Sequence, residues 1–117
     1  MSLDPSSYTP IEVERELLRY IGLLEQATQQ CRKRGIASAE ADSDFRTAYA
    51  RAVVGAEGTV LERESVAAIA TQVEYRKKRE AEELLHAARS ASANLREMVG
   101  ALRTISANIR QLVEAAR

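Results

Sequence analysis

The chain has 117 residues, of which 45% are hydrophobic but only 4% aromatic, and its 17 basic residues balance 17 acidic ones. So few aromatic residues do not suit a thick globular core, whereas an elongated helical assembly needs only one apolar stripe on each helix. The zero net charge argues against a nucleic-acid binder that relies on overall electrostatic attraction. Both prolines stand within the first ten residues, and only scattered glycines oppose helix formation after them.

The first predicted helix covers residues 10 to about 57 and follows an arm at residues 1–8, which we expect to be flexible. The start signal of this helix is Thr9, followed by Pro10 and, at the third helical position, Glu12. Thr-x-x-Glu is a capping box, and proline is tolerated at the first helical position because its missing N–H is not needed there.

An apolar seven-residue repeat runs along this first helix. Its spacing alternates between three and four residues, which places all its members on one stripe that faces a partner helix. The repeat keeps its phase across Gly35, where a loop would have no reason to preserve it, so we expect one continuous helix. The alternative is that the helix ends at Gly35 and residues 35–44 form a loop. The two series are Val13, Tyr20, Ala27, Arg34, Ala41 and Ala48, and Leu17, Leu24, Cys31, Ser38, Phe45 and Ala52.

A second predicted helix runs from residue 60 to about 115, after a turn at residues 58–59. Gly58 suits the left-handed position after a helix, and Thr59 with Glu62 forms a second capping box. In the second helix apolar residues occupy the repeat positions near both ends, whereas charged residues interrupt the repeat in the middle. The packing positions predicted for both helices are Val13, Leu17, Tyr20, Leu24, Phe45, Ala52, Val66, Ile69, Val73, Leu84, Leu95, Met98, Leu102, Ile105 and Ile109.

A fold-back at the turn pairs the two helices antiparallel, with facing residue numbers that sum to about 117. The acidic block at residues 40–44 then faces the basic block at residues 75–79, and the basic block at residues 32–34 faces two glutamates. Opposite charges in reversed order support this alignment. An exposed pair contributes only about 0–1 kcal/mol, so these pairs set the register more than they add stability. The simpler alternative is that both blocks are solvated faces of long helices.

These patterns predict an all-α fold, namely a long antiparallel helical hairpin of the coiled-coil type, with residues 9–117 as one domain. A hairpin of this size buries one stripe per helix and is marginally stable alone. Further apolar residues flank the predicted stripe, among them Leu18 and Leu85. We therefore expect a homo-oligomer, with a dimer that forms a four-helix bundle favoured over higher assemblies.

No pattern in the sequence points to catalysis, a cofactor or a metal. The only histidine, His86, stands three residues after Glu83 in the Glu-x-x-His spacing of di-iron bundles, but the chain has no second copy of that motif. The sequence also has no glycine-rich phosphate loop and no serine nucleophile elbow. We therefore predict a protein that is not an enzyme, with no catalytic, cofactor-binding or metal-binding residues.

The sequence suggests an intracellular protein. Its one cysteine, Cys31, permits no disulfide within the chain and fits a small residue of the packing stripe. The first residues include Asp4 and Pro5 and lack the apolar segment of a signal peptide. No apolar run approaches the roughly 20 residues that span a bilayer. We therefore expect a cytoplasmic location and no membrane partner.

The densest basic run is Tyr75-Arg76-Lys77-Lys78-Arg79. Its cations suit phosphate contacts, so direct nucleic-acid binding through Arg76, Lys77, Lys78 and Arg79 is one functional alternative. Only Tyr75 stands beside these cations for base stacking, and acidic residues follow the run at once. Ion pairing within the hairpin is therefore favoured over nucleic-acid contact.

Three sequence elements occur together between residues 45 and 112. They are Tyr49-Ala-Arg-Ala52, Glu57-Gly-Thr-Val60 and Leu102-Arg103-Thr104. Small coiled-coil proteins encoded by bacteriophages and prophages have similar elements, and this chain resembles them. Their genes often lie near replication or recombination genes. The resemblance implies an accessory protein that acts by protein–protein binding in the cytoplasm of a bacterial host, in DNA replication or recombination. A scaffolding coiled coil with no DNA role is the remaining alternative.

Overall fold

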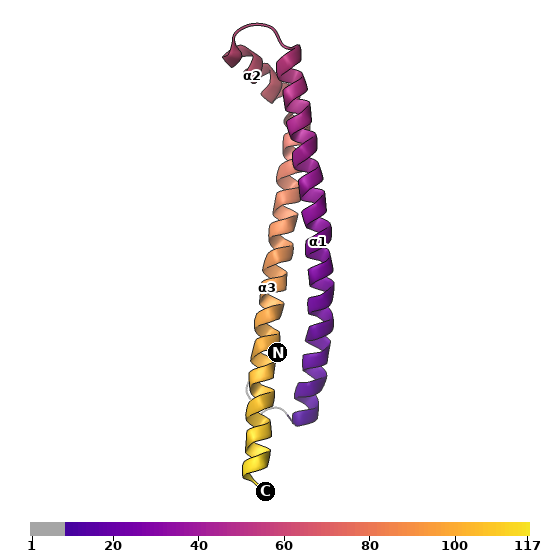
Figure 1. The fold of residues 1–117 in the computed structure, drawn as a ribbon, viewed down its shortest axis with the longest axis vertical. Helices are drawn as coiled ribbons and strands as arrows, with labels where there is room; N and C mark the ends of the chain where they lie inside the picture. Colours follow the sequence, from indigo (N-terminus) through magenta and orange to yellow (C-terminus); the bar gives the residue numbers. More distant parts are fainter. Residues whose placement is uncertain (1–8) are drawn as a thin grey trace. The chain divides into compact units, whose positions relative to one another are not determined.

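In the computed structural model, which describes residues 9–117, the chain forms three α-helices, and these residues contain no strand (Figure 1). Helix α1 is Pro10–Gly55, α2 is Val60–Ala70 and α3 is Gln72–Ala115. The predicted all-α helical hairpin is confirmed. The flexible arm predicted at residues 1–8 lies outside the described residues.

Helix α1 runs without a break through Gly35. Its capping box is formed in both directions: the backbone N–H of Glu12 donates to Thr9 Oγ1 at 3.3 Å, and the N–H of Thr9 donates to Glu12 Oε2 at 3.2 Å. Every member of the two seven-residue series from Val13 to Ala52 is buried or half-buried. The stripe is therefore the side of α1 that other parts of the chain cover.

The connection from α1 to α2 covers residues 56–59, since α1 ends two residues before the expected position. Gly58 has a φ of 107°, a left-handed conformation that favours glycine. Thr59 caps α2 through its hydroxyl, which accepts from the N–H of Glu62 at 3.2 Å. Arg63 of α2 donates from its Nε to the carbonyl of Val53 at 3.1 Å. The same carbonyl also accepts from the backbone N–H of Ala56 at 3.3 Å, so Arg63 adds a bond between α2 and the last turn of α1.

The second half of the chain is not one helix from residue 60 to residue 115, as the sequence predicts, but two helices that meet at Thr71 (Figure 1). Thr71 leaves the helical conformation with φ −112° and ψ 21°. Its hydroxyl donates to the carbonyl of Ala67 at 2.7 Å, and its backbone N–H donates to the same carbonyl at 3.0 Å. A threonine hydroxyl bonded to the carbonyl four residues back bends a helix, which explains the break.

The chain divides into two compact units, and each unit contains one part of α1 and one part of α3. Unit 1 combines residues up to Gln30 with Arg89–Arg117, and unit 2 is Cys31–Ala88, which includes all of α2. The sequence predicts one domain over residues 9–117. Helices α1 and α3 are each continuous across the boundary, so helix periodicity gives no sign of it.

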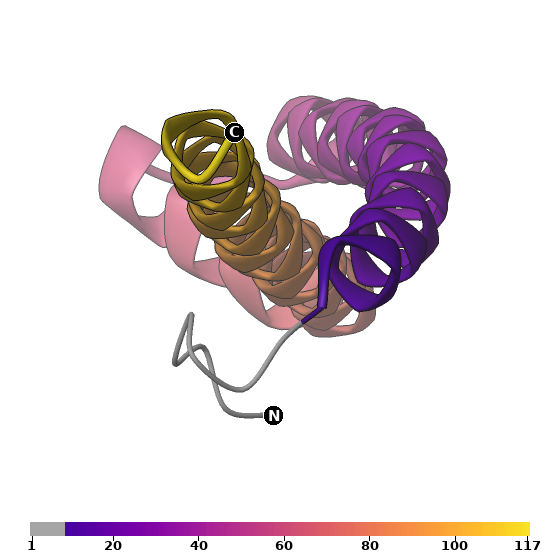
Figure 2. The same cartoon turned by 90° about the horizontal axis from the view of Figure 1, so that it is seen from below.

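Unit 1 holds the larger apolar side chains of the interface between α1 and α3. Val13, near the start of α1, clusters with Ile105 and Ile109, near the end of α3, and Leu102 has no exposed surface. The start of one helix thus meets the end of the other, which makes the pair antiparallel. Figure 2 looks along the helices from the end where α1 begins and α3 ends.

Unit 2 shows the same antiparallel order through different contacts. Phe45 contacts Tyr75 and Asp42 pairs with Lys78, and a Cβ placed on Gly35 would lie 4.0 Å from Cδ1 of Leu85. In each of the three, the two residue numbers sum to three more than the predicted value of about 117. The observed register is therefore within one helical turn of the register that charge pairing predicts.

The predicted packing positions divide into two groups. On α1 all are covered, and on α3 the covered ones are Leu95, Met98, Leu102, Ile105 and Ile109. Val66, Ile69, Val73 and Leu84 are instead 51%, 70%, 56% and 46% exposed. The reason is local: Ala67 and Thr71 face inward at the bend, and on α3 the half-buried residue is Leu85 rather than its neighbour Leu84. The apolar spacing therefore correctly shows that these four residues are apolar at helical intervals, but the prediction that they pack within the hairpin is wrong.

Alanine substitutions at the two glycines near the connection, Gly55 and Gly58, should affect the free energy of unfolding differently. A Cβ at Gly58 would clash with the carboxylate of Glu62 and would hold alanine at a positive φ, so Gly58→Ala should lower the free energy of unfolding by about 1–2 kcal/mol. Gly55 ends α1 and has nothing within 4 Å of an added Cβ, so Gly55→Ala should leave stability unchanged or raise it slightly. Urea unfolding followed by circular dichroism measures both. Equal effects of the two substitutions would contradict the left-handed assignment of Gly58.

Candidate interaction surfaces

The contact between α1 and α3 in unit 2 contains a small ion network. The Nζ of Lys78 lies 3.6 Å from Asp42 Oδ1 on α1 and 3.8 Å from Glu82 Oε1 on α3. Arg46 approaches Asp42 from its own helix, with 3.1 Å between Nε and Oδ2. The predicted meeting of the acidic and basic blocks thus occurs at Asp42 and Lys78. Each such pair adds at most about 1 kcal/mol, so the network fixes register rather than providing most of the stability.

The predicted pairing of the basic block at residues 32–34 with two glutamates of the other helix is not found among the described residues. Among the described residues, the basic block at residues 32–34 forms no ion pair with Glu82 or Glu83. Glu82 instead pairs with Lys78 and Arg79, which lie on its own helix. Side-chain pairs three and four residues apart on one helix form readily because they lie on adjacent turns.

Three of the five aromatic side chains of the protein gather beside this ion network. The ring of Phe45 lies 5.9 Å from that of Tyr49 and 5.5 Å from that of Tyr75, measured between centroids. The Nζ of Lys78 lies 5.3 Å from the centroid of Phe45, a cation–π distance. The sequence shows Tyr75 beside the basic run, but it did not predict that Phe45 and Tyr49 of α1 lie near the same run.

The four cations of the predicted basic run occupy different environments. Lys78 is half-buried between the helices, and Arg79 pairs with Glu82 at 2.9 Å. Arg76 and Lys77 are exposed, and neither forms an ion pair with another described residue. Half of the run is therefore used within the hairpin, and half is available to a partner.

An open hollow of about 620 Å³ adjoins these groups in unit 2. The three aromatic rings line it from two helices, together with Arg76 and Arg79. It lies open at the surface rather than enclosing a ligand, so it suits contact with part of a larger molecule better than capture of a small one. An adjoining open hollow is lined by both arginines and by Glu80 and Glu83, which reduces the positive charge of this surface.

An uncovered apolar surface lies across α2 and the start of α3. We call Val66, Ile69 and Val73 the α2 patch; Val66 and Ile69 are three residues apart on one side of α2, and Val73 follows just after the bend at Thr71. Each side chain is exposed by half or more. At the start of α2, Val60 and Leu61 are also exposed. Exposed apolar side chains at helical spacing mark a surface that a partner covers.

The apolar core of unit 2 is very small. Ala67 is its only fully buried apolar side chain, whereas unit 1 buries Val13, Val99, Leu102 and others. Unit 2 also buries the Oε2 of Glu74, which has no hydrogen-bond partner among the described residues. A buried polar atom without a partner opposes folding. Unit 2 therefore obtains little stability from fully buried apolar side chains.

Side chains that could hold a metal ion do not converge in the part of the chain that the structure describes. No cluster of three or more histidine, cysteine, aspartate or glutamate side chains is placed there to hold a metal ion. Cys31 is a half-buried free thiol on the packing side of α1. None of the described helices combines the length and apolar composition needed to cross a membrane. Comparison with known proteins finds no matching family model, no similar curated protein and no similar solved structure.

Proposed function

We propose that this protein acts by binding other helices, beginning with a second copy of itself, and not by catalysis. The contrast within unit 2 carries the proposal: its only fully buried apolar side chain is Ala67, while the α2 patch is exposed. Helices draw most of their stability from packing an apolar face. Covering the α2 patch would supply the apolar contacts that unit 2 lacks within the chain.

A second copy suits the α2 patch on physical grounds. A two-fold dimer brings the same surface of two chains together, and valine and isoleucine side chains can face their own copies because they carry no charge. The zero net charge of the chain also removes long-range repulsion between two copies. A homodimer that pairs the two α2 patches is therefore the favoured assembly.

The resemblance to phage and prophage coiled-coil proteins gives this assembly a biological setting. In that setting the dimer is an accessory protein that docks on a protein of DNA replication or recombination in the bacterial cytoplasm. A scaffolding coiled coil with no DNA role is the alternative that uses the same dimer. Capture of a defined replication or recombination protein by the purified dimer would favour the first over the second.

Placing a charge in the α2 patch tests the dimer. Ile69→Glu puts a carboxylate at the centre of the patch, so it should convert a dimer of the 12.9-kDa chain to a monomer in sedimentation equilibrium. Ile36→Glu is the matched control, since Ile36 is also an exposed isoleucine of unit 2 but lies on α1. We expect it to remain dimeric. A monomeric wild-type protein, or dissociation by the control alone, would contradict the proposed interface.

A second candidate function is contact with single-stranded nucleic acid at the hollow beside the basic run. The specific observation in its favour is that the rings of Phe45, Tyr49 and Tyr75 lie beside Arg76 and Arg79. Single-strand binding sites combine aromatic stacking surfaces with cations in this way. The nearby glutamates and the internal pairing of Arg79 with Glu82 place this function second.

Salt-dependent binding tests the second candidate. A fluorescent oligothymidine should bind the wild-type chain at about 50 mM salt, and Arg76→Ala should reduce the slope of log K against log salt by about 0.7. Tyr75→Ala should weaken binding through lost stacking, whereas Arg51→Ala, at an exposed arginine outside the hollow, should leave it unchanged. Absence of binding at this salt concentration would eliminate nucleic-acid contact at the hollow and leave the dimer proposal intact.

A further inference from the structure

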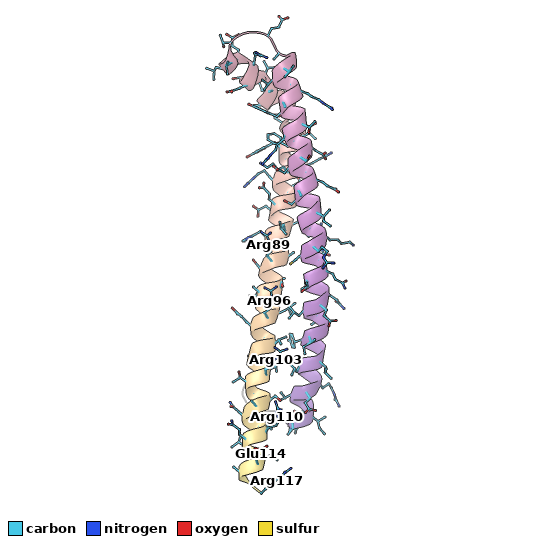
Figure 3. All side chains as sticks on the ribbon, in the orientation of Figure 1. Arg89, Arg96, Arg103, Arg110, Glu114 and Arg117 are labelled. Carbon is cyan, nitrogen blue, oxygen red and sulfur yellow. The ribbon has the colours of Figure 1, made fainter. Side chains whose placement is uncertain are left out.

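An arginine recurs every seven residues in the second half of α3. Arg89, Arg96, Arg103 and Arg110 lie in the helix and Arg117 follows its end, as Figure 3 labels them. We call the four helical members the arginine row. Seven residues are about two helical turns, or about 10.5 Å, so the four side chains begin from nearly one line.

The arginine row has no anionic partner within the described chain. All four side chains are exposed, and the ion pairs of residues 9–117 involve other cations. Residues 89–117 contain only two acidic residues, Glu97 and Glu114, against five arginines. Repeating exposed guanidinium groups that form no ion pair with a described carboxylate suit an anionic partner that extends along the helix.

Two arginines of the row border an open groove of about 370 Å³ in unit 1. The groove lies between Arg96 and Arg103 on α3 and is completed by the facing part of α1. Its other lining residues are Ile21, Leu24, Glu25 and Thr28 of α1 and Val99 and Gly100 of α3. A Cβ at Gly100 would meet nothing within 4 Å, so the surface between the two arginines is open to a partner.

Beyond the groove, helix α1 exposes two apolar side chains in line with Glu25. Leu18 precedes Glu25 by seven residues, and Ile11 precedes Leu18 by seven, so the three residues lie on one side of α1. Leu18 and Ile11 are 71% and 68% exposed. The α1 wall of the groove therefore carries the half-buried Ile21 and Leu24 and one exposed carboxylate, Glu25, with the exposed Leu18 and Ile11 beyond it. The α3 wall carries the unpaired cations Arg96 and Arg103.

We propose that the groove of unit 1 binds an amphipathic helix of another protein that carries an acidic residue every seven positions beside its apolar face. The apolar face of that helix covers Leu18 and Ile21, and its carboxylates meet Arg96 and Arg103. A helix in the groove between two paired helices is a common recognition mode, and charged residues flanking the apolar positions select the partner.

A second copy of this chain does not supply such a helix. Glu57 and Glu64 are its only acidic residues seven positions apart, and no acidic residue continues that spacing. A nucleic-acid strand would satisfy the arginines but would leave Leu18 and Ile11 uncovered. Residues 89–117 also offer no aromatic side chain for base stacking. An acidic amphipathic helix complements the exposed apolar residues of α1 and the cations of α3, with its carboxylates on the α3 side of the groove, away from Glu25, so the observations favour it.

The inference rests on the proposed function, which is binding through helices, but it uses a different surface from the α2 patch. Sedimentation of the protein alone tests the patch, and binding of an added peptide tests the groove. The two proposals can therefore fail separately.

The test uses the full chain and a synthetic three-heptad peptide with leucine at its apolar positions and glutamate every seven residues. Fluorescence anisotropy should show binding, and R96E/R103E should weaken it about tenfold or more, because two attractive pairs become repulsive. Lys33→Glu/Arg51→Glu is the matched control: it changes the net charge equally at exposed residues away from the groove, and binding should change less than about twofold.

A lysine version of the peptide separates a specific loss from misfolding. It should prefer R96E/R103E to the wild-type chain, which reverses the order seen with the glutamate peptide. Failure of the glutamate peptide to bind, equal binding of both peptides to the wild-type chain, or equal weakening by the control variant would overturn the proposal. Binding of oligothymidine through Arg96 and Arg103, without binding of the glutamate peptide, would also overturn it and assign the row to phosphate.

Discussion

The side of α1 that faces α3 is set by one seven-residue repeat from Val13 to Ala52, and the contacts between the two helices follow it. In unit 1 large aliphatic side chains meet along this interface and bury Leu102 completely. In unit 2 the same side of α1 carries mostly small side chains, and its contacts to α3 include one ion pair and the aromatic pair of Phe45 with Tyr75. The same repeat therefore forms an apolar contact between α1 and α3 in unit 1, whereas in unit 2 it mainly fixes which residues of the two helices face each other.

This difference determines where partners are expected. Unit 2 buries little apolar surface inside the chain and exposes the α2 patch, which suits a contact between copies. Unit 1 has its own small core, and its groove is lined by apolar residues and by two arginines of the arginine row, Arg96 and Arg103. The two surfaces differ in chemistry, because one is uncharged and self-complementary while the other requires negative charge. The two proposals together describe a dimer that binds an acidic helix of another protein.

Much of the fold could be predicted because helix signals are local. The capping box at Thr9 and the unbroken phase across Gly35 were sufficient to predict α1 as one helix. The bend at Thr71 was not predictable, since threonine occurs in straight and bent helices alike and its hydroxyl bond appears only in the structure. Periodicity shows which side of a helix is apolar but not whether it is covered, which explains the exposed Ile69. The hollow was missed because its rings come from two helices.

The central claim is the antiparallel register, and a pair of cysteines tests it most directly. In a Cys31→Ser background, Gly35→Cys with Leu85→Cys should form a disulfide within one chain on mild oxidation, since these positions face each other. Gly35→Cys with Ala81→Cys, one turn away on α3, should stay reduced. Non-reducing electrophoresis separates the two results. A disulfide in the second pair but not in the first would contradict the register and the account built on it.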